Sequence, residues 1–195
     1  MDPKPLPYQS LNGISDKTLA IHHDKLYAGY VAKCGEIREK LANLQDADLA
    51  SANQSYSALR ALKTDETFAV NGVYLHEAYF DGMGGEGLAA GTLADALAKE
   101  YGSFDRFVAY FSACGMAARG WVVLCWDTQE KALRVYAADA HNQGGVWGCI
   151  PLLVLDVYEH AYFIDAGSDR KSYIEAWWKN LDWKKADERY RATQN

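Results

Sequence analysis

The stretch from Ile150 to Phe163, IPLLVLDVYEHAYF, constrains the fold of this chain more than any other. Its first residues, Ile150–Leu155, are apolar and include β-branched side chains, and the run is too short for a helix of its own. It therefore predicts a buried strand. Pro151 is compatible with this strand because it lies at the start. Buried strands seldom end in an acid, yet this one leads directly into Asp156.

Asp156 and His160 lie four residues apart, where this strand meets a segment, Val157–Phe163, that is predicted to begin a helix. At that spacing a carboxylate and an imidazole can lie on one side of the backbone and point at one place. Both groups are ligands for hard or borderline metal ions. The alternative is an aspartate that caps the next helix and a histidine packed in a core. The pair alone does not decide between them.

Composition and charge limit the class of protein. With 195 residues, 49% of them hydrophobic, the chain can bury a core as one domain or as two small ones. A formal charge of −6 without a basic run argues against nucleic acid or an anionic membrane as a partner. No apolar run approaches the roughly 20 residues that a membrane span needs. The start, MDPKPLPYQS, has no signal-peptide pattern. We therefore expect a cytoplasmic protein.

The cysteines point to the same compartment. They are widely spaced, at Cys34, Cys114, Cys125 and Cys149, and form no CxxC pair. Reduced and mostly buried thiols are the expectation for such a chain in the cytoplasm. Nothing in the sequence requires a disulfide.

Two long helices are predicted in the N-terminal half, at about 15–44 and 55–83. Each carries apolar side chains at spacings of three or four, which is typical of a helix with one buried face. We expect the two helices to pack as an antiparallel hairpin. The segment 82–91, GMGGEGLAAG, then breaks the helical pattern, and we place a domain boundary near residue 88.

The C-terminal half mixes helices and strands. Helices are expected at Thr92–Glu100, Ser103–Ala118, Tyr173–Asn180 and Lys184–Thr193. Gly120–Asp127 and Ala132–Ala137 are β-rich runs around the turn TQEK and predict a hairpin. The strand at 150–155 would complete a three-stranded antiparallel sheet. The predicted fold class is α+β, with an N-terminal helical hairpin domain at 1–88 and a C-terminal α+β domain at 89–195.

The chain has few histidines, and some of them lie on apolar helix faces or close to Asp156. They are His22, His23, His76, His141 and His160. A single histidine on the apolar face of a helix is more often a core residue than a metal ligand. Here both long helices carry one on such a face, and a third follows Asp156. Each would need its own buried hydrogen-bond partner, whereas one shared cation satisfies all of them. Three imidazoles and one carboxylate without a thiolate suit iron or manganese better than zinc.

Several motifs then occur in a fixed order along the chain. They are LPY near the start, HHDKLYAGYV at 22–31, LHEAYF at 75–80, YGSFDRF at 101–107, GWVVL at 120–124 and DVYEHAYF at 156–163. With them the chain resembles the iron/manganese superoxide dismutases over nearly its whole length, and DVYEHAYF is the most specific motif. The resemblance implies one iron or manganese ion per subunit, held by His22, His76, Asp156 and His160. It also favours His22 over His23, which is then structural.

The resemblance also implies roles around the ion. Tyr30 matches the family's gateway tyrosine at the substrate channel, and Trp121 matches a tryptophan that lines the pocket; plain core packing is the alternative for both. One group of members uses a glutamine to bond the solvent on the metal, at the position that is Gly72 here. The other group supplies this side chain from the loop after the hairpin, which here offers His141 or Gln143. We favour His141, for which a solvent-exposed loop residue is the alternative.

Glu159 resembles an acid that, in the family, bonds the ligand histidine of the other subunit, which here would be His160. The resemblance therefore implies a homodimer and leaves a tetramer open. The alternative is a solvated acid on a helix. Such a contact would orient the imidazole of a metal ligand from outside the coordination sphere.

The chain departs from the family at several channel positions. Leu26 and Phe163 stand where many members have a hydrogen-bonded histidine and tyrosine, so both polar partners are lost together. Val123 and Phe80 stand where tryptophans are common. These changes spare the predicted ligands but alter the channel and the delivery of protons.

The function implied by the resemblance is superoxide dismutation, in which the metal alternates between +3 and +2 and superoxide becomes dioxygen and hydrogen peroxide. Two alternatives are kept. One is a same-fold iron or manganese oxidoreductase with a different small substrate, and the other is a metal-binding relative with low activity. The ligand set does not distinguish iron from manganese, because both ions take it.

Overall fold

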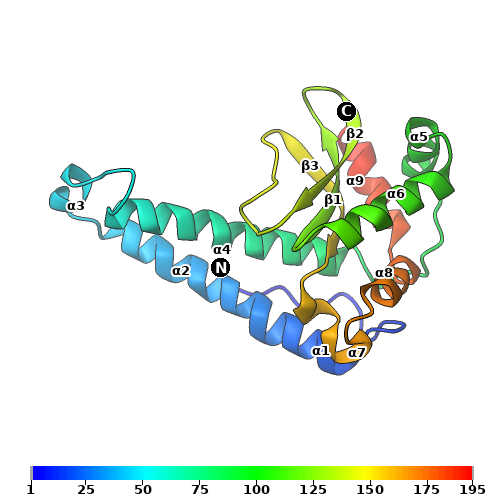
Figure 1. Ribbon diagram of the computed structural model, residues 1–195, viewed down its shortest axis with the longest axis horizontal. Coiled ribbons are helices and arrows are strands. Elements are labelled where there is room, and N and C mark those ends of the chain that lie inside the picture. Colours follow the sequence, from blue (N-terminus) through cyan, green and yellow to red (C-terminus); the bar gives the residue numbers. More distant parts are fainter. Residues whose placement is uncertain (1, 195) are drawn as a thin grey trace.

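The computed structural model describes residues 2–194, and two antiparallel helices form its long arm. These are α2 (Ala28–Ala42) and α4 (Ala58–Asp81), which pack against each other along their length (Figure 1). The short helix α3 (Asp46–Ala50) lies at the far tip, and α1 (Asp16–Ile21) lies at the base. The predicted helical hairpin is therefore confirmed.

The first long helix is not a continuous α-helix. Residues His22–Tyr27 form a stretch of π-helix, η1, between α1 and α2. Such wide turns inside α-helices occur frequently at functional sites. The chain is helical over nearly all of the predicted range of about 15–44, but the sequence did not reveal the π-helical stretch, because a single wide turn hardly changes the spacing of the apolar residues.

A three-stranded antiparallel sheet stands beside the base of the hairpin, as predicted. Its strands are β1 (Trp121–Asp127), β2 (Ala132–Ala138) and β3 (Cys149–Asp156), in the order β2-β1-β3. The register places Trp121 of β1 directly opposite Asp156 of β3. These two residues therefore lie at the same end of the sheet.

Helices cover the sheet. α6 (Phe104–Ala117) packs on β1 and β2, and α9 (Trp183–Ala192) packs on β3 (Figure 1). α5 (Thr92–Tyr101) packs on both of these helices, and α8 (Arg170–Lys179) packs on α6. All four helices lie within a few residues of their predicted bounds.

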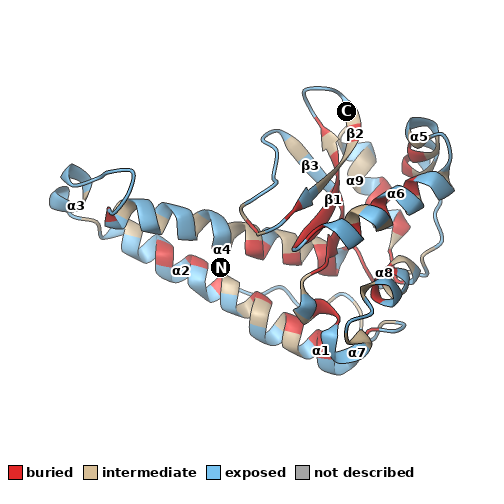
Figure 2. Cartoon of the chain, in the orientation of Figure 1, coloured by how far each residue is buried: buried red, intermediate tan, exposed pale blue. Residues whose placement is uncertain are grey.

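The buried residues gather where the hairpin base, the sheet and the C-terminal helices meet (Figure 2). The outer end of the hairpin is exposed by comparison. In the centre of the core, Phe111 of α6 stacks on Trp177 of α8, with ring centroids 5.4 Å apart and planes 5° apart. Among the described residues, no helix has the length and apolar character needed to cross a membrane.

The glycine-rich segment between the two halves is packed against the C-terminal helices. A Cβ at Gly85 would lie 2.4 Å from the carbonyl oxygen of Leu181, and one at Gly87 would lie 2.5 Å from that of Trp178. Glycine is needed at these positions because the backbones approach too closely for any side chain. The domain boundary near residue 88 lies in this segment and remains a prediction.

Candidate metal centre

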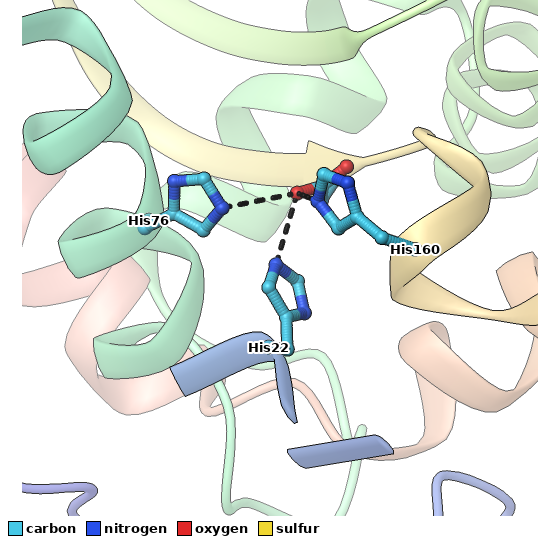
Figure 3. Close-up of side chains that lie close together, drawn as sticks. His22, His76 and His160 are labelled. Atoms are coloured by element: carbon cyan, nitrogen blue, oxygen red, sulfur yellow. Dashed lines mark hydrogen bonds and ion pairs between the residues drawn. The ribbon is translucent and has the colours of Figure 1, made fainter. Parts of the chain in front are cut away.

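The side chains predicted as metal ligands converge in one place. His22, His76, Asp156 and His160 each offer a ligand atom, and these atoms lie within 4.8 Å of one another. Asp156 Oδ2 is at the centre, 3.1 Å from His22 Nε2, 3.2 Å from His160 Nε2 and 3.6 Å from His76 Nε2 (Figure 3). The geometry required for a single ion is therefore present.

Four different elements supply these side chains. His22 is the first residue of the π-helix η1, His76 lies on α4, and Asp156 ends β3. His160 lies in η2 (Glu159–Ala161), a single turn of 3₁₀-helix. Residues far apart in the chain thus meet where the hairpin base faces the end of the sheet.

The prediction that Val157–Phe163 begins a helix is wrong. Val157 and Tyr158 are not helical, and an α-helix, α7 (Phe163–Ala166), starts only after η2. The backbone N–H of Tyr158 donates to Asp156 Oδ1 at 2.9 Å. The aspartate therefore closes a local turn, and the chain doubles back so that His160 reaches the same carboxylate.

Burial and charge determine the protonation of this cluster. His22, His76 and Asp156 are fully buried, and 26% of the His160 side chain is exposed. Burial lowers the pKa of His22, and burial together with His22 lowers the pKa of His76 to about 3. Burial also opposes ionisation of Asp156 and of His160, but their mutual attraction is stronger: it holds the pKa of Asp156 well below its usual range and raises that of His160. An ionised carboxylate therefore faces imidazoles of which the two most buried are neutral.

His76 provides a direct test of whether a cation fits. Its Nδ1 lies 2.5 Å from the carbonyl oxygen of Gly72, so Nδ1 carries the proton and Nε2 keeps a lone pair. This Nε2 is buried without a hydrogen-bond partner and lies 3.6 Å from Asp156 Oδ2. Two acceptors facing each other in the core are unfavourable, and a shared cation removes that cost. The three-nitrogen, one-oxygen donor set suits iron or manganese.

His141 and Trp121 lie beside the cluster. Trp121 Nε1 donates a hydrogen bond of 2.9 Å to His141 Nδ1, and both side chains are buried. The Trp121 ring meets the ring of His76 edge-on, with centroids 5.0 Å apart. Burial lowers the pKa of His141 to about 4, so the ring is neutral and its proton is on Nε2. His141 is thus able to donate a hydrogen bond from that atom.

The structure places His141 and Gln143, the two candidates for bonding the solvent on the metal, in different surroundings. The ring of His141 lies 5.8 Å from that of His76, whereas Gln143 is exposed in the loop between β2 and β3. The structure therefore brings His141 to the centre and leaves Gln143 outside it.

Tyr30 is half-buried between two of these histidines. Its ring lies 5.4 Å from His76 and 4.7 Å from His141. A Cβ at Gly72 would come within 3.0 Å of the Tyr30 ring. The tyrosine thus occupies the space that a side chain at position 72 would need, which explains the glycine there.

The remaining predicted positions differ in how near they lie to the cluster. Glu159 is exposed on the surface next to His160, and within one chain it does not enter the cluster. Phe163 is 57% exposed, whereas Val123 and Phe80 are buried. The ring of Phe80 packs edge-on against the ring of His22, 5.0 Å away.

His23 points away from the centre. Its Nε2 lies 2.8 Å from the carbonyl oxygen of Lys4 and its Nδ1 lies 2.7 Å from Asp24 Oδ1. It therefore ties the N-terminal segment to the first helix, which agrees with a structural role.

Three tyrosines at the centre were missed. Tyr158 stacks on His160, with ring centroids 5.3 Å apart. The Tyr173 hydroxyl donates to the main-chain oxygen of Asp156, and it also meets the hydroxyl of Tyr79. Tyr79 could have been noticed because it follows His76 by three residues and shares its helix face. Nothing in the sequence pointed to Tyr173.

Comparison with known proteins covers nearly the whole chain. The family model described as "Iron/manganese superoxide dismutases, C-terminal domain" matches residues 89–189. The protein "Superoxide dismutase [Fe]" of Aquifex pyrophilus is 42% identical over 193 residues, which are 97% of this chain and 91% of the relative. "Superoxide dismutase [Mn] 1" of Halobacterium salinarum is 36% identical over 194 residues, which are 97% and 94%. The similarity thus extends through the N-terminal half, and the relatives include proteins named for each metal.

Proposed function

The chain belongs to the iron/manganese superoxide dismutase family, and from this we propose that it converts superoxide to dioxygen and hydrogen peroxide at one iron or manganese ion per subunit. The observation that carries the proposal is the convergence of three imidazoles on one ionised carboxylate, with a buried imidazole lone pair that has no hydrogen-bond partner. When bound, the ion supplies a one-electron couple between its +3 and +2 states.

We propose that the ion is held by His22 Nε2, His76 Nε2, Asp156 Oδ2 and His160 Nε2. The hydrogen bond from His76 Nδ1 to Gly72 supports this assignment, because it fixes the tautomer and orients the ring. Neutral imidazoles and one carboxylate leave the bound ion with a net positive charge, which attracts an anionic substrate.

The protons of hydrogen peroxide would come from solvent and be relayed by side chains next to the ligands. Two superoxide ions and two protons give one dioxygen and one hydrogen peroxide. Burial, with the nearby charge of Asp156, raises the pKa of Tyr30, so its hydroxyl stays protonated. His141 holds a proton on Nε2 because Trp121 occupies its Nδ1. We therefore assign the handling of protons to Tyr30 and His141, with Trp121 orienting the histidine.

We also propose a homodimer, and leave a tetramer open. Glu159 is exposed next to His160. The Nε2 atom of His160 is directed at Asp156, so its Nδ1 atom is left for a partner outside this cluster. The adjacent Phe163 and Ile164 are exposed apolar residues, as is common at an interface. Light scattering of the purified protein would test this, and Glu159→Ala should weaken the dimer.

A cytoplasmic location is part of the same proposal. The four cysteines are unpaired in the structure, which is usual in a reducing compartment. The charge of −6 supports a protein that works without nucleic acid or a membrane. Fractionation of the native cells would test the location.

A second candidate is an oxidoreductase of the same fold that acts on another small molecule. The apolar residues Leu26 and Phe163 favour it, because a channel with fewer polar groups delivers protons less well. Superoxide turnover by the purified protein, with iron and manganese measured in the same sample, separates the two. Dismutation at a kcat/KM near the diffusional range of about 10⁸–10⁹ M⁻¹s⁻¹ supports the first. Bound metal without turnover supports the second, or a metal-binding relative with low activity, and a folded protein that takes up neither ion overturns all of them.

A further inference from the structure

A short hydrogen-bond chain of two tyrosines ends on the main chain of the proposed aspartate ligand. Tyr173 of α8 is buried, and its hydroxyl donates to the carbonyl oxygen of Asp156 at 2.7 Å. The Tyr79 hydroxyl of α4 lies 3.0 Å from the Tyr173 hydroxyl. Tyr173 has one hydroxyl proton, which is used on Asp156, so Tyr79 donates to Tyr173. The chain of bonds thus runs from α4 through α8 to the end of β3.

Tyr79 packs against one of the two histidines that the hairpin supplies and shares a helix face with the other. It follows His76 by three residues on α4, so the two side chains lie on the same face of the helix. Its ring also packs against the ring of His22, with centroids 5.2 Å apart and planes tilted by 38°. A displacement of Tyr79 would therefore disturb both helical imidazoles.

Tyr173 touches the other two ligand-bearing segments. Besides its bond to Asp156, its ring stacks on Tyr162, 5.2 Å away with planes 24° apart. Tyr162 follows His160 by two residues. Its hydroxyl accepts a hydrogen bond of 3.1 Å from Arg170 Nε of α8. The two tyrosines together thus contact every segment that supplies a proposed ligand.

The bond to Asp156 is made where the strand ends. Asp156 is the last residue of β3, and one further backbone bond, from Val157 N–H to the carbonyl oxygen of Gly120 at 2.8 Å, follows it. The carboxylate must stay within about 0.5 Å of its place among three imidazoles, as functional constellations require. The peptide group between Asp156 and Val157 is therefore held on both sides, by Gly120 at its N–H and by the Tyr173 hydroxyl at its carbonyl oxygen.

We propose that Tyr79 and Tyr173 are positioning residues of the metal centre. By linking α4 to the main chain of Asp156, they keep the carboxylate in register with the imidazoles from the hairpin. They touch ligand-bearing groups and do not contact substrate. The proposal rests on the metal-dependent function proposed above, because it assigns these residues to the ion that function requires.

The test uses Tyr173→Phe, Tyr79→Phe and the double variant, each loaded with Mn²⁺. Phenylalanine keeps the ring packing and removes only the hydroxyl. We expect the dissociation constant for Mn²⁺, from competition with a chelator, to rise about 10- to 100-fold in Tyr173→Phe, as on loss of other groups that orient ligands. The electron paramagnetic resonance spectrum of bound Mn²⁺ should change as well. Tyr79→Phe should change both in the same direction by less, and the double variant should resemble Tyr173→Phe because the two hydroxyls act in series.

Tyr136→Phe is the matched control. It removes a hydroxyl that donates to Asp127 at 3.3 Å. Asp127 ends β1, so this bond lies roughly 20 Å from Trp121 and the centre, although the main chain of Tyr136 pairs with Val123. This variant should lower the melting temperature and leave both the Mn²⁺ affinity and the spectrum unchanged.

The outcomes separate this inference from the proposed function. If Tyr173→Phe behaves like Tyr136→Phe, with a lower melting temperature but wild-type affinity and spectrum, the positioning role is wrong. If Tyr173→Phe does not fold, Tyr79→Phe decides in the same way, since it leaves the bond to Asp156 intact. A folded wild-type protein that binds neither Mn²⁺ nor iron would overturn both the function and the positioning role.

Discussion

The interior of this protein contains two buried regions of opposite character. Between α6 and α8 the core is apolar and aromatic: Phe111 stacks on Trp177, and Trp178 packs edge-on against Phe111 at 5.4 Å. Around Asp156 the interior is polar, with three imidazoles on one carboxylate and a tyrosine on its main chain. The two regions lie in one continuous core but differ in what stabilises them.

This difference assigns the two regions different tasks. Apolar burial is favourable by itself, at about 25 cal/mol per Å². A buried carboxylate and a buried imidazole without a donor cost free energy until something satisfies them. The apolar region therefore holds the fold, and the polar region is maintained for the ion that it can bind. Variants should be able to damage either region and leave the other intact.

The largest expected effect is the loss of metal in His160→Ala. The variant lacks one of four proposed ligands, and the alanine offers no other ligand atom. The metal content of the purified protein should therefore fall to near zero. His160 is also the partner that lowers the pKa of the buried Asp156, so its removal leaves this carboxylate less well paired and should lower the free energy of unfolding of the metal-free protein by about 1–3 kcal/mol. Elemental analysis and chemical denaturation measure the two quantities.

His23→Ala is the control for this variant. It removes an imidazole next to His22 that faces Lys4 and Asp24, so the metal content should stay at the wild-type level. Metal bound as tightly in His160→Ala as in His23→Ala would show that the ligand assignment is wrong.

The reverse result is expected from Phe111→Ala. This side chain is fully buried in the aromatic region, and its removal should cost about 3–5 kcal/mol in the free energy of unfolding. The folded fraction should still bind metal with wild-type affinity, because α6 supplies none of the proposed ligands. Met116→Ala, on the same helix but 52% exposed, should change stability by less than about 0.5 kcal/mol. A metal affinity that falls together with stability in Phe111→Ala would mean that the two regions are coupled.

The regular elements were predicted well from the sequence, because they depend on periodic spacing. The strand that ends at Asp156 and the long helix that carries His76 were placed within a few residues. Apolar residues repeated at helical or strand spacing mark the face of an element that is buried, and this pattern can be read from a short stretch of sequence.

The irregular elements of the polar region were not predictable in the same way. His22 begins a π-helix and His160 lies in a single 3₁₀ turn, and neither has a distinct apolar period. The bond from Tyr173 to Asp156 joins residues that are distant in the chain and depends on how α8 docks. Family motifs supplied the identity of the proposed ligands, but only the fold could place the groups that orient them.

A smaller effect is expected at the edge of the polar region, from His141→Ala. The change removes the acceptor for Trp121 Nε1 and leaves this indole buried without a partner. It also removes a proposed proton donor, so kcat for superoxide should fall about 10- to 100-fold while the ion stays bound. Stopped-flow kinetics and metal analysis of the same sample measure both. His141→Gln should recover part of the activity, because an amide can both donate and accept.

Gln143→Ala serves as its control, since this side chain lies exposed in the same loop. Its kinetics should match the wild type. A wild-type rate in His141→Ala together with a reduced rate in Gln143→Ala would reverse the assignment.

The smallest effect concerns a second carboxylate, Asp187, which contrasts with Asp156. Asp187 Oδ1 accepts hydrogen bonds from Leu93 N at 2.7 Å and from the Thr92 hydroxyl at 2.8 Å, so that α9 caps the first turn of α5. Here donors of the protein itself satisfy the acid and no cation is required. Asp187→Ala should therefore cost about 1–2 kcal/mol in the free energy of unfolding, the usual value of a cap, without affecting the metal.

The pH dependence of this cost distinguishes a charged cap from simple packing. Burial opposes ionisation of Asp187, but the hydrogen bonds outweigh it and hold its pKa below the usual range. A carboxyl with a lowered pKa stabilises the fold above the unfolded-state pKa of about 4 and loses that contribution as the pH falls through the folded-state pKa. Chemical denaturation should show the full difference between wild type and Asp187→Ala at pH 7 and a smaller one at pH 3. Asp187→Asn, which keeps an acceptor oxygen but no charge, should lose less stability at pH 7. If the difference in the free energy of unfolding is the same at both pH values, the charge of Asp187 does not contribute. Asp187 would then stabilise the fold by packing alone, and it would not serve as a second charged carboxylate to compare with Asp156.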